Sequence, residues 1–305
     1  MTESKSDFHG EIFKPNDPFV RFLSDRKEKL FYLKPSLGNS GDHLIELGDS
    51  ELLANLGIKT TVDPRLAEVI LWPGGNPTMY ELSHAGWCEV LQAFPNAEFV
   101  VAPATFQMGH YDWPSLFRRE GAKITGLFAR DAESFQNLKQ AGLPTTITIG
   151  LSHDPALKLR DTEWMTKHRA AATNEYVLLA FRDDKEASVS ISKPLAAAIR
   201  YLPKSISNRI SWRISQGARV KKFERIKRSL PPTDKAIQWD VSLAIFQAYV
   251  EGVRRARVVH TDRLHVMILA ALLKKPVVAY QTTYGKLEAV YKNSLKDWAD
   301  VSFQR

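Results

Sequence analysis

An arginine and a histidine stand close together near the end of the chain, in the stretch His260-Thr-Asp-Arg-Leu-His265. The apolar run before it, Arg257-Val-Val, predicts a buried parallel strand, and Thr261-Asp262 has the residue types that cap helices. The following helix would carry Arg263 and His265 in its first turn, where the helix dipole is positive. Together they could form an anion-binding site with a proton donor. The alternative is that both side chains are simply exposed or hydrogen-bonded.

The sequence beyond His265 predicts the elements that would hold these two side chains. The helix becomes apolar and stops near Lys274-Lys275-Pro276, and a second strand runs from Pro276 to Tyr280. Tyr284-Gly285-Lys286 comes next, followed by a terminal helix from Leu287 to about Leu295. Because open α/β sheets bind ligands at the carboxyl ends of their strands, the junction at 261–265 is the first candidate site.

A glycine-containing loop in the first half of the chain is the second candidate. Leu30–Leu33 predicts a strand, and Gly38-Asn39-Ser-Gly41-Asp42 then opens a helix that runs to about Asn55. Glycine lets the backbone approach a ligand closely, and Asp42 falls in the first helical turn. The loop is not GxGxxG and has no Walker lysine. A purely structural turn is an equally good interpretation.

The pattern of strand, polar loop and helix repeats along the first half. The predicted strands are residues 30–33, 68–72, 98–102, 123–129 and 145–149. Gly74-Gly75-Asn76 follows the second strand closely, and Arg130-Asp131 follows the fourth. Short apolar strands that alternate with helices indicate a parallel, doubly wound sheet.

The second half repeats this architecture after a polar stretch, Arg160–Thr173, which predicts a linker. A strand from Glu175 to Phe181 ends at Arg182. The further predicted elements are a helix at 191–201, a strand at 236–239 and a helix at 242–256. The fold class is therefore α/β with two Rossmann-like domains, residues 1–165 and 166–305.

The composition is that of a globular protein with room for two domains. The chain has 305 residues, of which 44% are hydrophobic and 25% are charged. It has no apolar run of about 18 residues and no signal-peptide region at its N-terminus, so we expect a cytoplasmic protein. The single cysteine, Cys88, excludes an intramolecular disulfide. No Cys and His cluster has the spacing of a metal site, so no metal is expected.

Much of the net charge of +8 lies between residues 200 and 228. The basic residues there are Arg200, Lys204, Arg209, Arg213, Arg219, Lys221, Lys222, Arg225, Lys227 and Arg228. Such a segment fits a solvated basic face or a peripheral contact with the anionic inner membrane surface. No helix-turn-helix, zinc finger or aromatic RNA-binding motif accompanies it, so nucleic acid is not an expected partner.

Several of these segments occur in an order and spacing that match one known family. They are Gly38-Asn39-x-Gly41-Asp42, Trp72-Pro-Gly-Gly-Asn76, Phe128-Ala-Arg-Asp-x-x-Ser134, Asp154-Pro-Ala, Phe181-Arg-Asp-Asp-Lys-Glu186, Thr261-Asp-Arg-Leu-His265 and Tyr284-Gly-Lys286. On these residues the chain resembles the polysaccharide pyruvyl transferases over roughly residues 30 to 290. Two positions depart from the family's pattern. The loop at 73–76 is poorer in glycine than usual, and Val266 stands where glycine is typical.

The resemblance implies a glycosyltransferase-B-like fold, in which two Rossmann-like domains face each other across a cleft. It implies transfer of a pyruvyl group from phosphoenolpyruvate to two hydroxyls of a sugar, which forms a cyclic ketal and releases phosphate. The acceptor would be a saccharide of an exopolysaccharide or cell-surface polysaccharide, often while still lipid-linked at the inner membrane face. Phosphoenolpyruvate is the donor substrate, and no cofactor is implied. The N-terminal domain would take the acceptor and the C-terminal domain the donor.

The implied chemistry assigns roles to residues of this chain. Phosphoenolpyruvate carries a carboxylate and a phosphate, so Arg182 and Arg263, at two strand ends, are the expected donor-binding cations. His265 would be the general acid that protonates the methylene carbon, and Asp42 would be the base for a sugar hydroxyl. Further donor contacts would be Tyr284 and Lys286, and the acceptor or loop residues would be Gly38, Asn39, Gly41, Gly74, Gly75, Asn76 and Arg130.

Two other functions fit the same features. One is a nucleotide-sugar-dependent glycosyltransferase of the same fold, which binding and hydrolysis of a nucleotide sugar would reveal. The other is a non-catalytic scaffold for polysaccharide assembly that uses residues 200–228 on anionic lipid. His153 and Asp154 are open to two interpretations, as hinge or capping residues and as part of the site.

Overall fold

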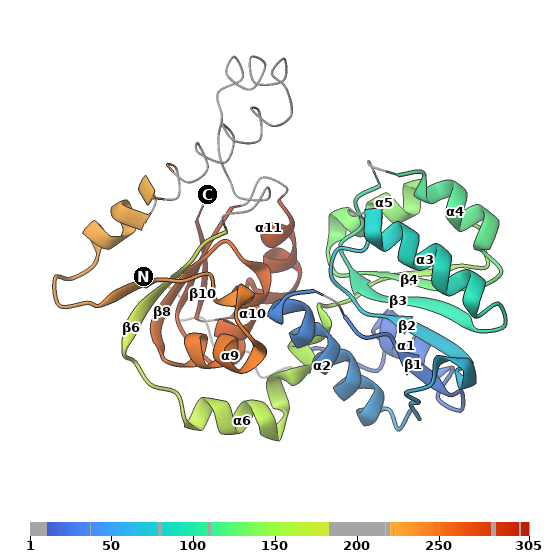
Figure 1. Ribbon diagram of the computed structural model, residues 1–305, viewed down its shortest axis with the longest axis horizontal. Coiled ribbons are helices and arrows are strands. Elements are labelled where there is room, and N and C mark those ends of the chain that lie inside the picture. The colour runs from blue at the N-terminus through green and yellow to red at the C-terminus, as the bar shows by residue number, and fades with distance from the viewer. Residues whose placement is uncertain are drawn as a thin grey trace, which may run out of the picture. The chain divides into compact units, whose positions relative to one another are not determined.

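The structure, a computed structural model, describes residues 11–36, 38–78, 81–108, 111–182, 217, 220–221, 223–281, 285–298 and 300–304. The chain divides into two compact units. Unit 1 comprises Met1–Lys167 and Ala289–Ala299, and unit 2 comprises His168–Glu288 and Asp300–Arg305. Each unit contains a five-stranded sheet with helices packed on it (Figure 1). This is the predicted α/β fold class.

The strands of unit 1 are all parallel and lie in the order in which the chain makes them. They are β1 (Phe31–Leu33), β2 (Val69–Trp72), β3 (Glu98–Ala104), β4 (Ile124–Ala129) and β5 (Thr148–Leu151). The predicted strands are confirmed, although β5 lies later in the sequence than expected. The order β1-β2-β3-β4-β5 contains no reversal, so the prediction of a doubly wound sheet was wrong for this unit.

Helices cover both faces of this sheet. They are α1 (Pro18–Ser24), α2 (Ser40–Asn55), α3 (Glu81–Ala93), α4 (Trp113–Glu120) and α5 (Ala132–Gln140). Figure 1 shows α3, α4 and α5 on one side of the sheet and α1 on the other. In β4, Leu127 belongs to the core under α3, α4 and α5, whereas Phe128 lies 5.0 and 5.1 Å from the rings of Phe19 and Phe22 in α1. Successive residues of a strand point to opposite faces, so β4 supplies both cores.

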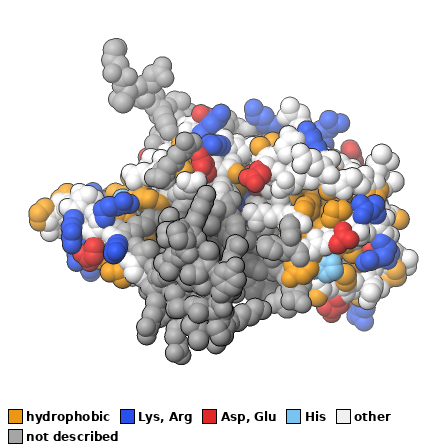
Figure 2. Space-filling view, turned by 90° about the horizontal axis from the view of Figure 1, so that it is seen from above, with side chains coloured by type: hydrophobic (Ala, Val, Ile, Leu, Met, Phe, Trp, Pro, Cys, Tyr) orange, Lys and Arg blue, Asp and Glu red, His pale blue; other side chains and the backbone are white. Residues whose placement is uncertain are grey.

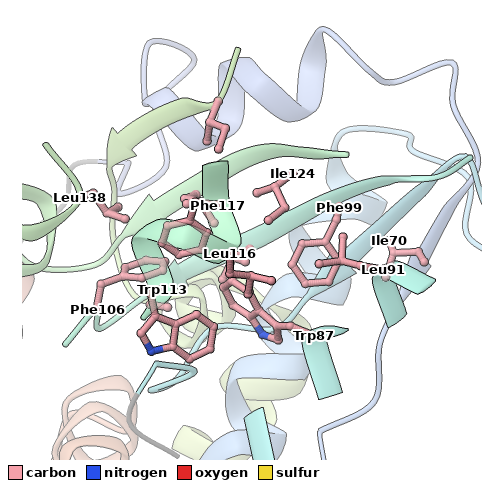
Figure 3. Packing of buried hydrophobic residues seen from close by; sticks show 14 of the residues in the cluster. Ile70, Trp87, Leu91, Phe99, Phe106, Trp113, Leu116, Phe117, Ile124 and Leu138 are labelled. Atoms are coloured by element: carbon pink, nitrogen blue, oxygen red, sulfur yellow. The ribbon is translucent and has the colours of Figure 1, made fainter. Parts of the chain in front are cut away.

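The larger core of unit 1 is aromatic. The ring of Trp87 in α3 meets Trp113 of α4 and Phe99 of β3 edge-on, with centroid distances of 4.9 and 5.1 Å (Figure 3). All three side chains are buried. Such pairs each contribute about 0.5–1.5 kcal/mol beyond the burial of their area. This core holds α3 and α4 to the sheet whose carboxyl edge carries the glycine loops.

The polar stretch predicted as a linker is helical. A 3₁₀ helix, η2, spans Pro155–Asp161, and α6 spans Glu163–Ala170. The Thr162 hydroxyl caps α6 by accepting the Met165 N–H at 3.2 Å, and the Met165 side chain is buried. The boundary between the two units, at Lys167 and His168, lies inside the stretch predicted as a linker, so this connection is a short polar helix with one buried face.

The sheet of unit 2 reverses its strand order. Its parallel strands are β6 (Tyr176–Ala180), β7 (Ala236–Gln238), β8 (Ala256–Thr261), β9 (Val277–Tyr280) and β10 (Val301–Gln304). The order is β10-β9-β8-β6-β7, so β7 lies on one side of β6 and β8 lies on the other. The strands β6 to β9 were predicted. The edge strand β10 was not, because its short run of residues shows little pattern.

The helices of unit 2 centre on an apolar one. They are α9 (Phe246–Arg254), which follows the 3₁₀ turn η3 (Val241–Leu243), then α10 (Leu264–Leu272), and the start of α11 (Lys286–Val290). From Ala289 onward the residues belong to unit 1, where α11 continues as the π-helical turn η4 (Tyr291–Leu295). Every residue of α10 except His265 is buried. The helix ends where Lys274 takes a positive φ of 55° and the Lys275 N–H donates to the Ala270 carbonyl at 2.8 Å. The predicted helix at 191–201 lies outside the described residues.

The described residues of the basic segment, 217, 220–221 and 223–228, are helical. The side chains of Arg225, Lys227 and Arg228 are exposed. Figure 2 shows this part of the chain at the left, where Lys and Arg side chains gather beside hydrophobic ones. Most of the predicted basic segment lies outside the described residues. Of the helices that the structure describes, none is both long and apolar enough to cross a membrane.

Candidate functional site

The carboxyl edge of unit 2 at β6 and β8 is the place where the strand order reverses. Open α/β sheets bind ligands at such a point, because the connections leave it in opposite directions and open a crevice. Arg182 follows β6, and its backbone N–H donates to the Asp262 carboxylate at 2.8 Å, just after β8. The structure therefore brings the backbone of Arg182 beside the turn that carries Arg263.

The turn between β8 and α10 differs from the predicted helix cap. The Thr261 hydroxyl donates to the Ala180 carbonyl at 2.8 Å and accepts the Arg263 N–H at 2.9 Å. The Asp262 carboxylate accepts the Arg182 N–H, and the residue at the N-cap position of α10 is Arg263, whose side chain makes no capping hydrogen bond. The capping prediction was wrong, because both side chains join β8 to β6. The uncapped helix N-terminus is suited to an anion.

Arg263 is held by a carboxylate that the sequence analysis did not identify. Its Nη2 forms an ion pair with Asp240, and the two side chains are 7% and 10% exposed. The Ser242 hydroxyl donates to Asp240 at 2.7 Å and orients it. Asp240 comes two residues after β7, which is the neighbour of β6. A polar residue directly after the predicted strand 236–239 was the signal that could have found it.

His265 lies in the first turn of α10 and is half-buried. Its backbone carbonyl accepts the Tyr249 hydroxyl at 2.7 Å, which ties this turn to α9. Lys286 is half-buried at the start of α11, directly after Gly285 with its positive φ of 67°. Tyr284 lies outside the described residues. This edge of unit 2 thus carries cationic side chains and one imidazole after neighbouring strands.

In unit 1, the loop after β1 is a capping box at the start of α2. The Asn39 side chain accepts the Gly41 N–H at 2.8 Å, and Asp42 Oδ2 accepts the Asn39 N–H at 3.0 Å. A Cβ at Gly38 would lie 1.7 Å from Asp42 Oδ2, so the cap requires glycine there. Asp42 Oδ1 faces the next loop, since a Cβ at Gly75 would lie 3.6 Å from it.

The loop after β2 packs against the end of β3. A Cβ at Gly74 would lie 2.5 Å from the Pro103 carbonyl oxygen, and Gly75 has a φ of 103°. The Gly75 carbonyl accepts the Thr105 N–H at 2.9 Å. Both glycines are therefore required by the backbone itself. Asn76, beside them, is half-buried.

Arg130 is buried in an ion pair at the ends of the strands of unit 1. Its Nη1 donates to Asp154 Oδ2 at 2.7 Å, and the two side chains are 2% and 0% exposed. Its Nε donates to the Thr105 hydroxyl at 3.0 Å. Asp154 also caps η2 by accepting the Ala156 N–H at 3.1 Å, which is the capping interpretation of this residue. Arg130 joins the ends of three strands and has little surface left for an acceptor.

A second buried carboxyl, Asp49 of α2, lies near this ion pair. Burial, followed by the charge of Asp154, raises the pKa of Asp49 well above its ordinary value. The adjacent Gly48 packs so closely on η2 that a Cβ there would lie 2.0 Å from the Pro155 carbonyl oxygen. Burial disfavours the ionised carboxylate, and the negative charge of Asp154 disfavours it further. No group of three or more His, Cys, Asp or Glu side chains within the described ranges could hold a metal ion.

Two units, each a parallel sheet with helices and with polar or glycine loops at its carboxyl edge, place the chain in the class of two-unit α/β proteins. Within that class, residues 11–283 match the sequence profile of one family, Polysaccharide pyruvyl transferase. The chain belongs to the polysaccharide pyruvyl transferase family. Its role is accordingly that of a transferase in polysaccharide synthesis.

One solved structure shares the fold, and two others resemble the chain only weakly. The protein KP1_0663 of Klebsiella pneumoniae is 20% identical with a TM-score of 0.65, and the match covers 94% of this chain and 97% of that one. The UDP-GlcNAc 2-epimerase of Methanocaldococcus jannaschii is 13% identical, with a TM-score of 0.35 and coverage of 82% and 83%. HepE of Anabaena is 14% identical, with a TM-score of 0.38 and coverage of 83% and 80%. The last two similarities are too low to bear on function. Among curated proteins, none matches this chain.

Proposed function

We propose that the protein transfers a pyruvyl group from phosphoenolpyruvate to two hydroxyls of a saccharide, forming a cyclic ketal and releasing phosphate. The observation that carries this proposal is the placement of Arg182, Arg263 and His265 after adjacent strands at the β6/β8 edge, in a member of the polysaccharide pyruvyl transferase family. The donor has two anionic groups and a carbon that must be protonated. The two guanidinium groups can bind the two anionic groups, and the imidazole can donate the proton.

The donor's anions are assigned to the two arginines. A guanidinium has five N–H donors in a rigid plane, so Arg263 can keep its ion pair with Asp240 and bind an anion as well. The bond from the Arg182 N–H to Asp262 fixes the start of that side chain. The N-terminus of α10 adds partial positive charge, and Lys286 is a candidate for a phosphate contact.

The chemistry begins with transfer of a proton from His265 to the methylene carbon C3, which makes C2 electrophilic. The oxygen of the first sugar hydroxyl bonds to C2, and its proton passes to a base. The C2–O bond to phosphate then breaks, and the second hydroxyl oxygen bonds to the same carbon. Of the two hydroxyl protons, one replaces the proton that His265 gave up and the other leaves with phosphate. Asp42 is the candidate base.

The test is phosphate release from phosphoenolpyruvate by the full chain, in the presence of a panel of galactosides, glucosides and mannosides. We expect release that depends on one class of sugar, with formation of the ketal confirmed by mass spectrometry. His265→Ala should lower turnover by about 10²–10⁴-fold and leave the melting temperature unchanged. The matched control is His43→Ala, because that imidazole is 49% exposed in unit 1.

Two results would refute the proposal. If no sugar promotes phosphate release, pyruvyl transfer loses its support. If the chain instead hydrolyses a nucleotide sugar, and His265→Ala abolishes that hydrolysis, the site belongs to a glycosyltransferase. A His265→Ala variant with full activity would leave the edge at β6 and β8 without a catalytic role.

A further inference from the structure

Unit 1 contains an open pocket of about 420 Å³ that includes none of the residues assigned to the donor or the acceptor, although His153, which the sequence left open, lies in it. One side is the chain before α1, from Glu11 to Pro18, and the other is the segment from Asn293 to Trp298. His153, which follows β5, completes the lining. Pockets that hold small ligands have volumes of roughly 300–1,000 Å³, so this one can hold a sugar unit.

Hydrogen bonds fix the lining of this pocket. The Asn293 Nδ2 donates to the carbonyls of Arg130 and Ser152 at 3.1 and 2.9 Å, which holds the segment 293–298 to the ends of β4 and β5. His153 Nδ1 lies 2.9 Å from the Ser294 hydroxyl. A ligand would therefore meet side chains that are already ordered, and preorganisation of this kind strengthens binding.

The charges of the lining disfavour an anionic ligand. Three carboxylates, Glu11, Asp17 and Asp297, line the pocket together with a single ammonium group, Lys14. Both Asp17 oxygens lie 2.9 Å from the Ser152 hydroxyl, so that carboxylate is held in place. Phosphoenolpyruvate or a nucleotide would be repelled by this arrangement. A ligand rich in hydroxyl groups would instead donate hydrogen bonds to the carboxylates.

His153 has the character of a neutral hydrogen-bonding group. Burial lowers the pKa of His153, although the charge of Asp17 opposes that effect. With Nδ1 against Ser294, its Nε2 has no hydrogen-bond partner among the described residues. A neutral imidazole offers one donor and one acceptor, which suits a hydroxyl.

Trp298 supplies an aromatic side chain beside these polar groups. The apolar C–H face of a sugar ring packs against an aromatic face while the hydroxyls at its rim form hydrogen bonds. We propose that this pocket binds a neutral saccharide unit, with the Trp298 indole against the ring and Ser294, Asp297 and His153 bonded to its hydroxyls. The inference rests on the proposed function, because a polysaccharide acceptor carries further sugar units beside the one that is pyruvylated.

Binding can be measured without turnover. Saturation-transfer NMR and calorimetry on the full chain would use methyl galactoside, methyl glucoside, methyl mannoside and their disaccharides, with inorganic phosphate as the anionic probe. We expect one neutral sugar of the panel to bind, and Trp298→Ala to raise the dissociation constant of that sugar by about tenfold or more. Inorganic phosphate should not bind in the pocket. The matched control is Trp239→Ala, because that indole lies in unit 2 and is 37% exposed.

A second variant guards against misfolding. Asp297 is exposed, so Asp297→Ala should keep the melting temperature and still weaken the sugar by a few-fold. In the turnover assay, Trp298→Ala should raise the KM of the acceptor and leave the KM of phosphoenolpyruvate unchanged. The pocket assignment is overturned if no sugar of the panel binds, if Trp298→Ala and Asp297→Ala bind it normally, or if phosphate displaces it. If the protein binds a sugar through Trp298 but releases no phosphate from phosphoenolpyruvate, the proposed function is refuted and the pocket assignment is retained.

Discussion

Replacing Arg130 by methionine tests whether this arginine belongs to the scaffold or to the acceptor site. The side chains of Arg130 and Asp154 are 2% and 0% exposed, so removal of the cation leaves a buried carboxylate without its partner. Breaking a buried ion pair from one side costs about 3–5 kcal/mol. At roughly 2–4 °C per kcal/mol for a unit of this size, the melting temperature should fall by about 6–20 °C.

The assay is urea unfolding and thermal melting followed by tryptophan fluorescence and near-ultraviolet circular dichroism. The double variant Arg130→Met/Asp154→Asn should recover most of the loss, because it removes the unpaired charge and keeps a side-chain oxygen that can cap η2. The control is Arg65→Met, since Arg65 pairs with Asp63 at the surface and is 81% exposed. A variant Arg130→Met that keeps its melting temperature and loses turnover would refute this reasoning and make Arg130 a substrate contact.

Three further variants test the other assignments. Arg263→Lys keeps the positive charge but loses the planar guanidinium, which can bind an anion through two N–H groups. The KM of phosphoenolpyruvate should therefore rise by roughly 10–100-fold in the phosphate-release assay. An unchanged KM would contradict the donor role of Arg263. Burial lowers the pKa of His260 to about 4. Between about pH 6.5 and 4 the unfolded chain therefore binds a proton at this histidine that the folded protein does not bind. The free energy of unfolding should fall as the pH drops through this range. His260→Gln should remove this loss, about 1–2 kcal/mol after allowance for partial exposure, in urea unfolding at several pH values. The pKa of Asp49 is raised, so its folded form holds a proton that the unfolded form releases above about pH 3.9, and the parent loses stability as the pH rises above that value. Asp49→Asn should therefore gain stability relative to the parent as the pH rises above about 4, and a constant difference would contradict this reasoning.

The strands and their loop residues could be predicted because each depends on a local pattern. Apolar runs fix β2, β4, β6 and β8, and Arg182 and Arg263 can be placed at strand ends by counting along the chain. The neighbours of a strand depend on packing between distant segments. The Arg263 partner, Asp240, comes from β7, and nothing in residues 236–240 tells that β7 lies beside β6.

The interpretation of polar residues was less certain for the same reason. Arg130 and Arg263 both follow strands, and the family resemblance assigned Arg130 to the acceptor or loop residues and Arg263 to the donor. The structure distinguishes them by their surroundings. Arg130 is enclosed with Asp154 and Thr105, whereas Arg263 lies at the reversal of strand order, beside the uncapped N-terminus of α10. The return of residues 289–299 to unit 1 was likewise unpredictable, because Asn293 is an ordinary helical residue until its partners are known.

The carboxylates at the β6/β8 edge explain how a site with little excess charge could still select a doubly anionic donor. Asp262 accepts the backbone N–H of Arg182, and Asp240 forms an ion pair with the guanidinium of Arg263, so a carboxylate lies beside each arginine. The ordering of a free arginine side chain opposes binding by about 2 kcal/mol of rotamer entropy. Because Asp240 already fixes the Arg263 side chain in the folded protein, this rotamer entropy is lost during folding and does not weaken binding of the donor. Recognition then rests on the position of the guanidinium and the helix N-terminus more than on net charge, so donor affinity should depend only weakly on salt.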